Sequence, residues 1–149
     1  MPIRKTIRGL LVTLIAVAGL AAVNTAPASA SASGFTMFSS GTVPTPWGDY
    51  PIPSGELDHG VTGDGLYVES QSAGFSAVPS LCNWTLTYEL RDVNHNVVDS
   101  QKIDLGSRCD SNLYVPGVTW NKDTVPGFAC AVLRVGESEI ATQCHQVAG

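Results

Sequence analysis

The stretch Cys82-Asn83-Trp84-Thr85-Leu86-Thr87-Tyr88-Glu89-Leu90 decides the fold. Apolar and polar residues alternate along it without a break, so that Cys82, Trp84, Leu86, Tyr88 and Leu90 share one face. A period of two residues is typical of a β-strand that buries one of its faces. We therefore predict a half-buried strand here, with Trp84 directed into the core.

The polar cluster around Asn94-His95 follows this strand and predicts the turn of a hairpin. Centring the turn there places Leu86 opposite Ile103, and directly opposed residues share a face of the sheet. The same register brings Cys82 to within one step of Cys109 on that face. The hairpin thus favours a disulfide between these two cysteines.

A second hairpin is predicted at the end of the chain. Phe128–Val135 is apolar on both faces except for Arg134, and a short turn over residues 136–138 leads into a returning strand. This register sets Cys130 opposite Cys144. Four cysteines allow three pairings, and the two hairpins favour Cys82–Cys109 together with Cys130–Cys144.

Turn signals recur at short intervals outside the two hairpins, and no helical period is evident after residue 30. This pattern predicts an all-β chain of six to eight short strands. We expect a small, disulfide-stapled antiparallel β-sandwich, either Ig-like or an open barrel.

Part of the first hairpin turn, Asp92-x-Asn94-x-Asn96, matches the first ligand positions of a calcium-binding loop. However, Val97 stands where such a loop has its glycine, and Ile103 stands where it has its bidentate acid. A hairpin turn explains the residues better, so we predict no metal site.

The first thirty residues predict a secretory signal peptide. A basic start (Arg4, Lys5, Arg8) precedes the apolar run Leu10–Val23, and the small residues Ala28-Ser29-Ala30 suit signal peptidase. The run is shorter than the roughly 20 apolar residues that cross a bilayer. We expect a secreted protein, extracellular or bound to the cell wall, with no membrane anchor after cleavage.

Residues 31–56 are rich in Pro, Gly and Ser, and prolines deny backbone donors to a sheet. We predict an extended arm here, so that the β domain covers residues 57–149. Trp47 and Tyr50 in the arm, and Trp120 in the domain, are candidate contact residues because exposed aromatic side chains are common at binding sites.

The charge balance excludes some partners. The chain has 8 Lys and Arg against 13 Asp and Glu, a net charge of −5. Removing the signal takes away three basic residues and no acid, which leaves 5 against 13 and a net charge of −8. Nucleic acids and anionic membranes attract basic surfaces, so we expect neither as a partner.

No catalytic pattern is present in the sequence. His59, His95 and His145 are scattered and do not form H-E-x-x-H, and no G-x-S-x-G nucleophile motif occurs. We therefore expect no enzyme, no catalytic residue and no cofactor.

The pattern Cys82-Asn83-Trp84, then Cys109, then Ala129-Cys130-Ala131, then Gln143-Cys144-His145 resembles small secreted four-cysteine proteins of actinobacteria whose function is unassigned. The resemblance covers roughly residues 57–149. It implies an extracellular, disulfide-stapled β domain and assigns no catalytic residue.

Two classes of function fit these expectations. The first is a non-catalytic binding or envelope-associated protein that recognises a glycan or a protein. The alternative is a proteinaceous inhibitor of a secreted hydrolase, a protease or an amylase, with residues 110–114 beside Cys109 as the inhibitory loop. A loop held rigid by a disulfide loses less entropy on binding.

Overall fold

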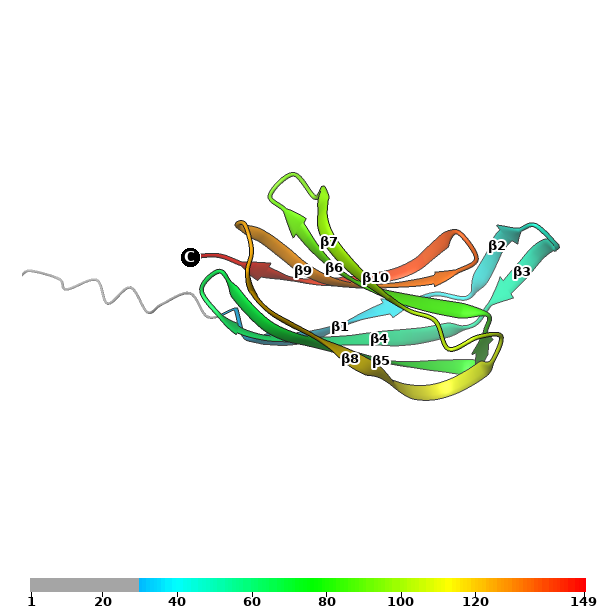
Figure 1. The fold of residues 1–149 in the computed structure, drawn as a ribbon. Coiled ribbons are helices and arrows are strands. Elements are labelled where there is room, and N and C mark those ends of the chain that lie inside the picture. The colour runs from blue at the N-terminus through cyan, green and yellow to red at the C-terminus, as the bar shows by residue number, and fades with distance from the viewer. Residues whose placement is uncertain (1–29) are drawn as a thin grey trace, which may run out of the picture.

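Two four-stranded antiparallel sheets pack face to face in the computed structural model, which describes residues 30–149 (Figure 1). The strands are β1 (Ala32–Phe38), β2 (Gly41–Thr45), β3 (Gly48–Ile52), β4 (Ser54–Asp64), β5 (Tyr67–Cys82), β6 (Trp84–Asp92), β7 (Val97–Ile103), β8 (Cys109–Asp123), β9 (Gly127–Val135) and β10 (Ser138–Val147). The β5 sheet has the order β1-β4-β5-β8, and the β6 sheet has the order β10-β9-β6-β7. The all-β sandwich is thus confirmed, with ten strands in place of six to eight. The predicted signal peptide falls on residues 1–29, which lie outside the described residues.

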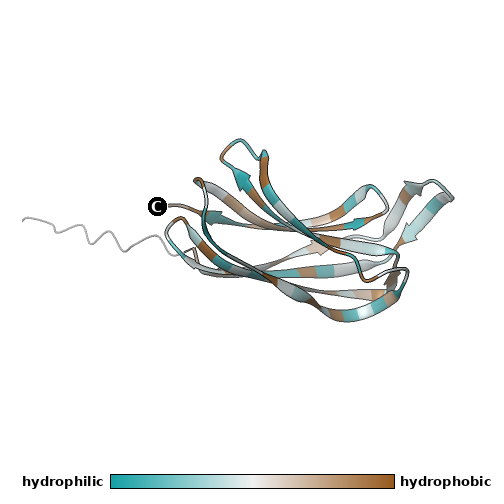
Figure 2. Ribbon diagram, viewed as in Figure 1, coloured by the Kyte–Doolittle hydropathy of each residue, from teal (hydrophilic) through white to brown (hydrophobic). Residues whose placement is uncertain are grey.

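The core lies between the two sheets and follows the predicted alternation. Figure 2 shows hydrophobic and hydrophilic residues interspersed along the strands of both sheets. Trp84, Leu86, Tyr88 and Leu90 are all buried on the inner face of β6. The ring of Trp84 meets the ring of Phe75 edge to face, with centroids 5.0 Å apart. This aromatic pair joins the two sheets, and such a geometry adds to the stabilisation from buried area alone.

The predicted strand that begins at Cys82 is split by a corner at Asn83. Cys82 is the last residue of β5 and pairs with Cys109 of β8, whereas Trp84 begins β6 in the opposite sheet. Asn83 has φ 53°, in the left-handed region, and its backbone N–H donates to the Arg108 carbonyl at 3.0 Å. Asn adopts this conformation more readily than most residues, so the chain changes sheet at this position.

The structure forms the two disulfides that the hairpin registers favour, Cys82–Cys109 and Cys130–Cys144. Each bridge joins directly opposed residues of neighbouring strands, so neither crosses between the sheets. The predicted pairing of Leu86 with Ile103 is confirmed as well. Two disulfides indicate an oxidising environment.

Residues 31–56 differ from the predicted extended arm. β1 pairs with β4 from Ala32–Val61 to Phe38–Gly55, which makes it an edge strand of the β5 sheet. Its outer edge meets β10, where the Thr36 hydroxyl donates to the Gln143 side chain. The folded body therefore begins at β1, and sequence reasoning missed this strand because its proline-rich neighbour dominated the composition.

Three of the four prolines, Pro44, Pro46 and Pro51, lie in a two-stranded hairpin, β2–β3, that projects from one end of the sandwich (Figure 1). Pro44 pairs with Asp49 and Pro51 pairs with Thr42, so both prolines belong to the same alternate set of pairs. Every second residue of an antiparallel strand directs its N–H away from the partner strand. Prolines in such positions are compatible with an edge strand.

The turn between β6 and β7 is held by Asp92, as the hairpin interpretation requires. Its carboxylate accepts the backbone N–H groups of Asn94 and Asn96 at 2.8 and 2.9 Å, and the Asn96 side-chain amide at 3.0 Å. The bonds from Asn96 are the main reason why the pKa of Asp92 is lowered.

No helix of the described residues is long and apolar enough to span a membrane.

Replacement of Asn83 tests the corner. We expect Asn83→Val to lower the free energy of unfolding by about 1–2 kcal/mol, because a β-branched side chain is strained at a positive φ. Asn83→Gly should stay close to the wild type, since glycine adopts this conformation freely. Urea denaturation measures both, with Asn112→Val in the extended part of β8 as the control. Equal stability of the Val and Gly variants would contradict the corner.

Candidate functional site

A groove of about 650 Å³ opens where the β2–β3 hairpin leans over the end of the sandwich. We call it the hairpin groove. Three loops and the hairpin contribute its walls: Thr45, Trp47, Gly48, Asp49 and Tyr50 from the hairpin, Asn83, Trp84 and Thr85 from the corner, Asp104, Gly106 and Ser107 from the β7–β8 loop, and Val135 and Gly136 from the β9–β10 turn. Its size is that of a site for a small ligand or for part of a polymer.

The tip of the hairpin presents Trp47 to solvent. Thr45 pairs with Gly48 across a two-residue loop, and the Thr45 hydroxyl donates to the Gly48 carbonyl at 2.6 Å. The same hydroxyl accepts the Trp47 backbone N–H at 3.3 Å. Pro46 precedes Trp47, and proline suits the first central position of a tight turn. These contacts hold the backbone while the Trp47 side chain stays 85% exposed.

The floor of the hairpin groove is the Asn83 corner. The indole Nε1 of Trp84 donates to the Asp110 carboxylate at 2.8 Å, and the Arg108 guanidinium contacts the same carboxylate at 2.5 Å. Arg108 first, and then Trp84, lower the pKa of Asp110. The carboxylate is therefore charged at neutral pH and fixes the orientation of the Trp84 ring. Within this floor the Trp84 ring is buried, whereas Asn83 is exposed to the groove.

Two of the three predicted contact residues meet in this groove, and the third does not. Trp47 and Tyr50 both line it. Tyr50 is half-buried and packs against the core, so it supports the wall from below. Trp120 is only 9% exposed and lies in β8, on the inner face of the β5 sheet. The structure removes it from the candidate site.

Trp120 belongs to a buried polar network. With the amide oxygen of Gln71 directed at Trp120, Gln71 accepts the indole N–H at 3.0 Å. Its amide nitrogen then donates to the Cys130 carbonyl at 3.1 Å and to Nε2 of His59 at 3.0 Å. A buried indole normally finds such a partner. Sequence reasoning missed it because Gln71 and Trp120 come from different strands.

His59 is 2% exposed and is held neutral in this network. Burial first, and the nearby His145 ring second, lower the pKa of His59 from its ordinary 6.5 to about 4. The two rings stack with centroids 5.1 Å apart, and Nε2 of His145 lies 3.1 Å from the His59 carbonyl oxygen. Both histidines therefore have structural roles, and neither lines the hairpin groove.

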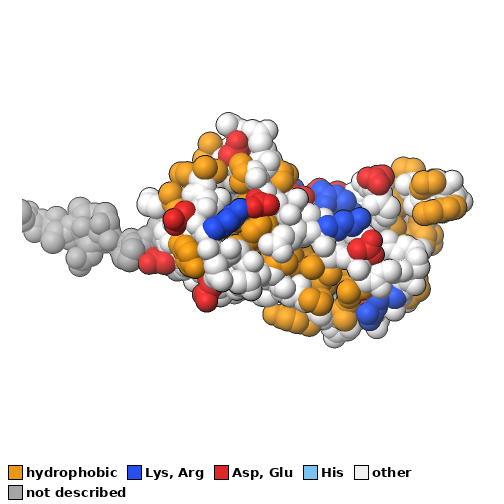
Figure 3. Space-filling view, in the orientation of Figure 1, with side chains coloured by type: hydrophobic (Ala, Val, Ile, Leu, Met, Phe, Trp, Pro, Cys, Tyr) orange, Lys and Arg blue, Asp and Glu red, His pale blue; other side chains and the backbone are white. Residues whose placement is uncertain are grey.

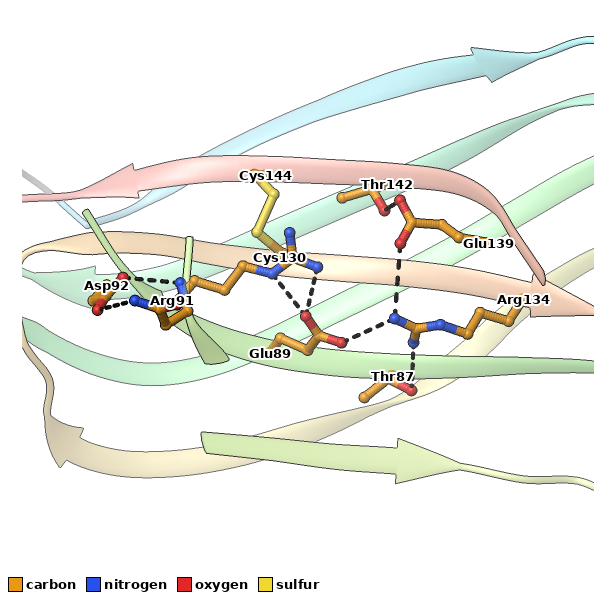
Figure 4. A network of polar contacts seen from close by, with 10 residues as sticks. Thr87, Glu89, Arg91, Asp92, Cys130, Arg134, Glu139, Thr142 and Cys144 are labelled. Carbon is orange, nitrogen blue, oxygen red and sulfur yellow. Dashed lines mark hydrogen bonds and ion pairs between the residues drawn. A yellow bond between two sulfur atoms is a disulfide. The ribbon is translucent and has the colours of Figure 1, made fainter. Parts of the chain in front are cut away.

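A second polar cluster lies on the outer face of the β6 sheet (Figure 4). Glu89 is only 4% exposed there, because Arg91 and Arg134 close over it from either side. Glu89 accepts from Arg91 Nε at 2.7 Å and from Arg134 at 3.3 Å. Arg134 also contacts Glu139 at 3.7 Å. The charges compensate one another beside the Cys130–Cys144 bridge. We therefore interpret the cluster as the ion pairs that allow Glu89 to be buried, and not as a binding site.

The segment proposed as an inhibitory loop is a strand. Residues 110–114 belong to β8 and pair with β5, with Leu113 opposite Phe75 and Tyr114 opposite Gly74. Residues 110–114 therefore do not form a protruding loop. The inhibitor hypothesis loses the element on which it was based.

The hairpin groove combines an apolar, largely aromatic surface with several polar side chains. Its lining combines one exposed indole with the carboxylates of Asp49 and Asp104, the amide of Asn83 and the hydroxyl of Ser107. It holds no His, Cys or Lys. Within residues 30–149, no group of three or more His, Cys, Asp or Glu side chains is placed to hold a metal ion. The groove is thus equipped for hydrogen bonding and aromatic stacking.

Sequence reasoning missed Asp49, Asn83, Asp104 and Ser107 as lining residues. They come from three separate turns, and only the fold brings these turns together.

Comparison of the chain with protein-family models, curated proteins and solved structures gave no match. The resemblance to actinobacterial four-cysteine proteins therefore stays a prediction.

The low pKa of His59 predicts how stability depends on pH. Between pH 6.5 and 4 the unfolded chain binds a proton at this residue that the folded chain does not. Stability should therefore fall as the pH drops through this window, by about 1 kcal/mol between pH 7 and 5.5 from His59 alone. Urea denaturation at several pH values measures the slope. His59→Gln should reduce it, and an unchanged slope in this variant would contradict the assignment.

Proposed function

We propose that the chain is a secreted, non-catalytic binding protein whose hairpin groove takes part of an extracellular glycan. The observation that carries the proposal is Trp47, which is 85% exposed at the tip of an ordered hairpin and lines a groove that also holds polar side chains. Leaving an indole in water forfeits roughly 2–3 kcal/mol of burial. Tryptophan is also the residue most enriched where binding energy concentrates.

The lining supports a glycan better than a purely apolar ligand. A sugar ring has an apolar C–H face, which can stack on an indole, and a rim of hydroxyls. Asp49 and Asp104 offer acceptors, and Asn83 and Ser107 offer both donors and acceptors. A groove open to solvent also allows a polymer to continue beyond it. The disulfides support the extracellular location, since they persist in oxidising compartments.

A binding test with polysaccharides checks this function. The disulfide-bonded protein is mixed with insoluble chitin, cellulose and bacterial cell-wall glycan, and the retained fraction is measured. We expect at least one of them to retain the wild type, Trp47→Ala to bind tenfold more weakly or worse, and Trp47→Phe to be intermediate. The control is Tyr67→Ala, which removes a half-exposed aromatic ring from the β4–β5 turn at the other end of the sandwich.

Two results would contradict the proposal. One is the absence of retention on all three polysaccharides, and the other is equal retention of the wild type and Trp47→Ala. Stoichiometric inhibition of a secreted protease or amylase that Trp47→Ala leaves unchanged would instead support the alternative function.

A further inference from the structure

A second groove, of about 730 Å³, lies on the outer face of the β5 sheet. We call it the sheet groove; it shares no lining residue with the hairpin groove. Hydrophobic side chains gather along this side of the molecule, at the lower margin of Figure 3 over β5 and β8. No covering element of the described chain packs on this face. It is therefore a surface that the fold leaves open.

One cross-strand row defines the middle of the sheet groove. The register sets Phe35 opposite Asp58, Asp58 opposite Gly74, and Gly74 opposite Tyr114. Neighbouring strands lie about 4.8 Å apart, so the backbones of Phe35 and Tyr114 are roughly 14 Å apart. A carboxylate and a glycine thus lie between two aromatic side chains.

Gly74 lies beside the Tyr114 ring in this row. A Cβ atom at Gly74 would lie 3.7 Å from the ring atom Cδ2 of Tyr114 and 3.2 Å from the Leu113 carbonyl oxygen. The distance to the ring is an ordinary van der Waals contact, so the Tyr114 ring lies beside Gly74 of β5, and Tyr114 is 72% exposed. At this row Gly74 adds no side chain to the floor of the groove, and the ring of Tyr114 forms its wall.

The next row along the strands repeats the pattern. Met37 stands opposite Glu56, and Glu56 stands opposite Ser76. Residues two apart on a strand point the same way and are separated by about 7 Å. Glu56 and Asp58 therefore form a ladder of two carboxylates, and Phe35 and Met37 form an apolar ladder beside it, with side chains 60% and 65% exposed.

The carboxylate ladder has no basic side chain near it in its own sheet. The sequence contains no Lys or Arg between residues 31 and 90. Lys122 is the one Lys or Arg in the four strands of this sheet. Its amine pairs with Asp99 of β7 and lies 5.3 Å from the Trp120 ring, on the inner side. The outer face therefore presents negative charge without internal compensation.

We propose that the sheet groove, together with the adjoining Met37 and Glu56 just outside its lining, binds an extended basic peptide. Lys or Arg at alternate positions of this peptide places its cations over Glu56 and Asp58. Alternate side chains of an extended chain recur every 7 Å or so, which matches the spacing of the two carboxylates. The aliphatic stems of Lys or Arg pack on Phe35 and Met37, since such stems cover apolar surface readily. Tyr114 bounds the groove on the other side, where its ring face attracts a cation.

The other occupants fit this face less well. A neutral glycan supplies no charge to match the two carboxylates. A second copy of the chain, docked through the same face, would bring four carboxylates together, and like charges at an interface are unfavourable. Charge complementarity thus favours a cationic partner. The two-residue spacing of Glu56 and Asp58 on β4 favours a partner in an extended conformation.

Fluorescence anisotropy tests the proposal. The probe is the fluorescein-labelled peptide Val-Lys-Val-Lys-Val, titrated with the disulfide-bonded protein at low and at physiological salt. We expect saturable binding that weakens with salt, and no binding of the Val-Glu-Val-Glu-Val peptide. Asp58→Asn and Glu56→Gln should each weaken binding about two- to fivefold, and together about tenfold. Phe35→Ala and Tyr114→Ala should weaken it by similar factors.

The matched control is Glu137→Gln, which removes one exposed carboxylate from the β9–β10 turn of the other sheet. It should change the affinity by less than twofold, and Trp47→Ala should leave it unchanged. Near-UV circular dichroism verifies that each variant is folded. Failure of the peptide to bind, or an equal loss in Glu137→Gln, would overturn the proposal. A dimer in sedimentation equilibrium that Phe35→Ala dissociates would overturn it too, because the face would then be a self-interface. None of these results bears on the hairpin groove, whose test uses polysaccharides.

Discussion

The clamp around Asn83 is the constraint on which the rest of the structure depends. Three successive residues at the corner are each tied to the start of β8: Cys82 by its disulfide to Cys109, Asn83 by its backbone bond to the Arg108 carbonyl, and Trp84 by its indole bond to Asp110. The last residue of β5 and the first residue of β6 are thus held by adjacent residues of one strand. Because the chain turns here, β5 and β6 belong to two different sheets that pack face to face. The aromatic pair of Trp84 and Phe75 fills the space between these sheets.

The same clamp gives the hairpin groove its rigid floor. The Trp84 ring is fixed from one side by Asp110, and the Asn83 amide sits on a backbone position that only a few residue types adopt readily. The β2–β3 hairpin contributes a wall with its own internal hydrogen bonds. A site built this way loses little conformational entropy when a ligand binds. The sheet groove is a different kind of surface, because its side chains come from four neighbouring strands. The distance between its two carboxylates is the two-residue repeat of a β-strand.

Alternating residues and short turns in the sequence predicted the structural features that depend on neighbouring residues alone. The β6–β7 and β9–β10 hairpins, their registers and the Cys130–Cys144 pairing follow from alternation and short turns, so they could be read directly. The corner could not, because one left-handed residue does not interrupt an alternating pattern. Trp120 was misassigned for a related reason: its hydrogen-bond partner, Gln71, is 49 positions away in the sequence, on a neighbouring strand. The outward-facing pair Phe35 and Met37 was hidden in a segment whose prolines suggested an arm.

Peptide mapping by mass spectrometry of the unreduced protein tests the central claim most directly. Digestion between the cysteines should release one crosslinked pair that contains Cys82 and Cys109 and a second that contains Cys130 and Cys144. This is the result expected if β5 ends against β8 and the chain turns at Asn83. A crosslink from Cys82 or Cys109 to either of the other two cysteines would contradict the corner, and with it the floor of the hairpin groove.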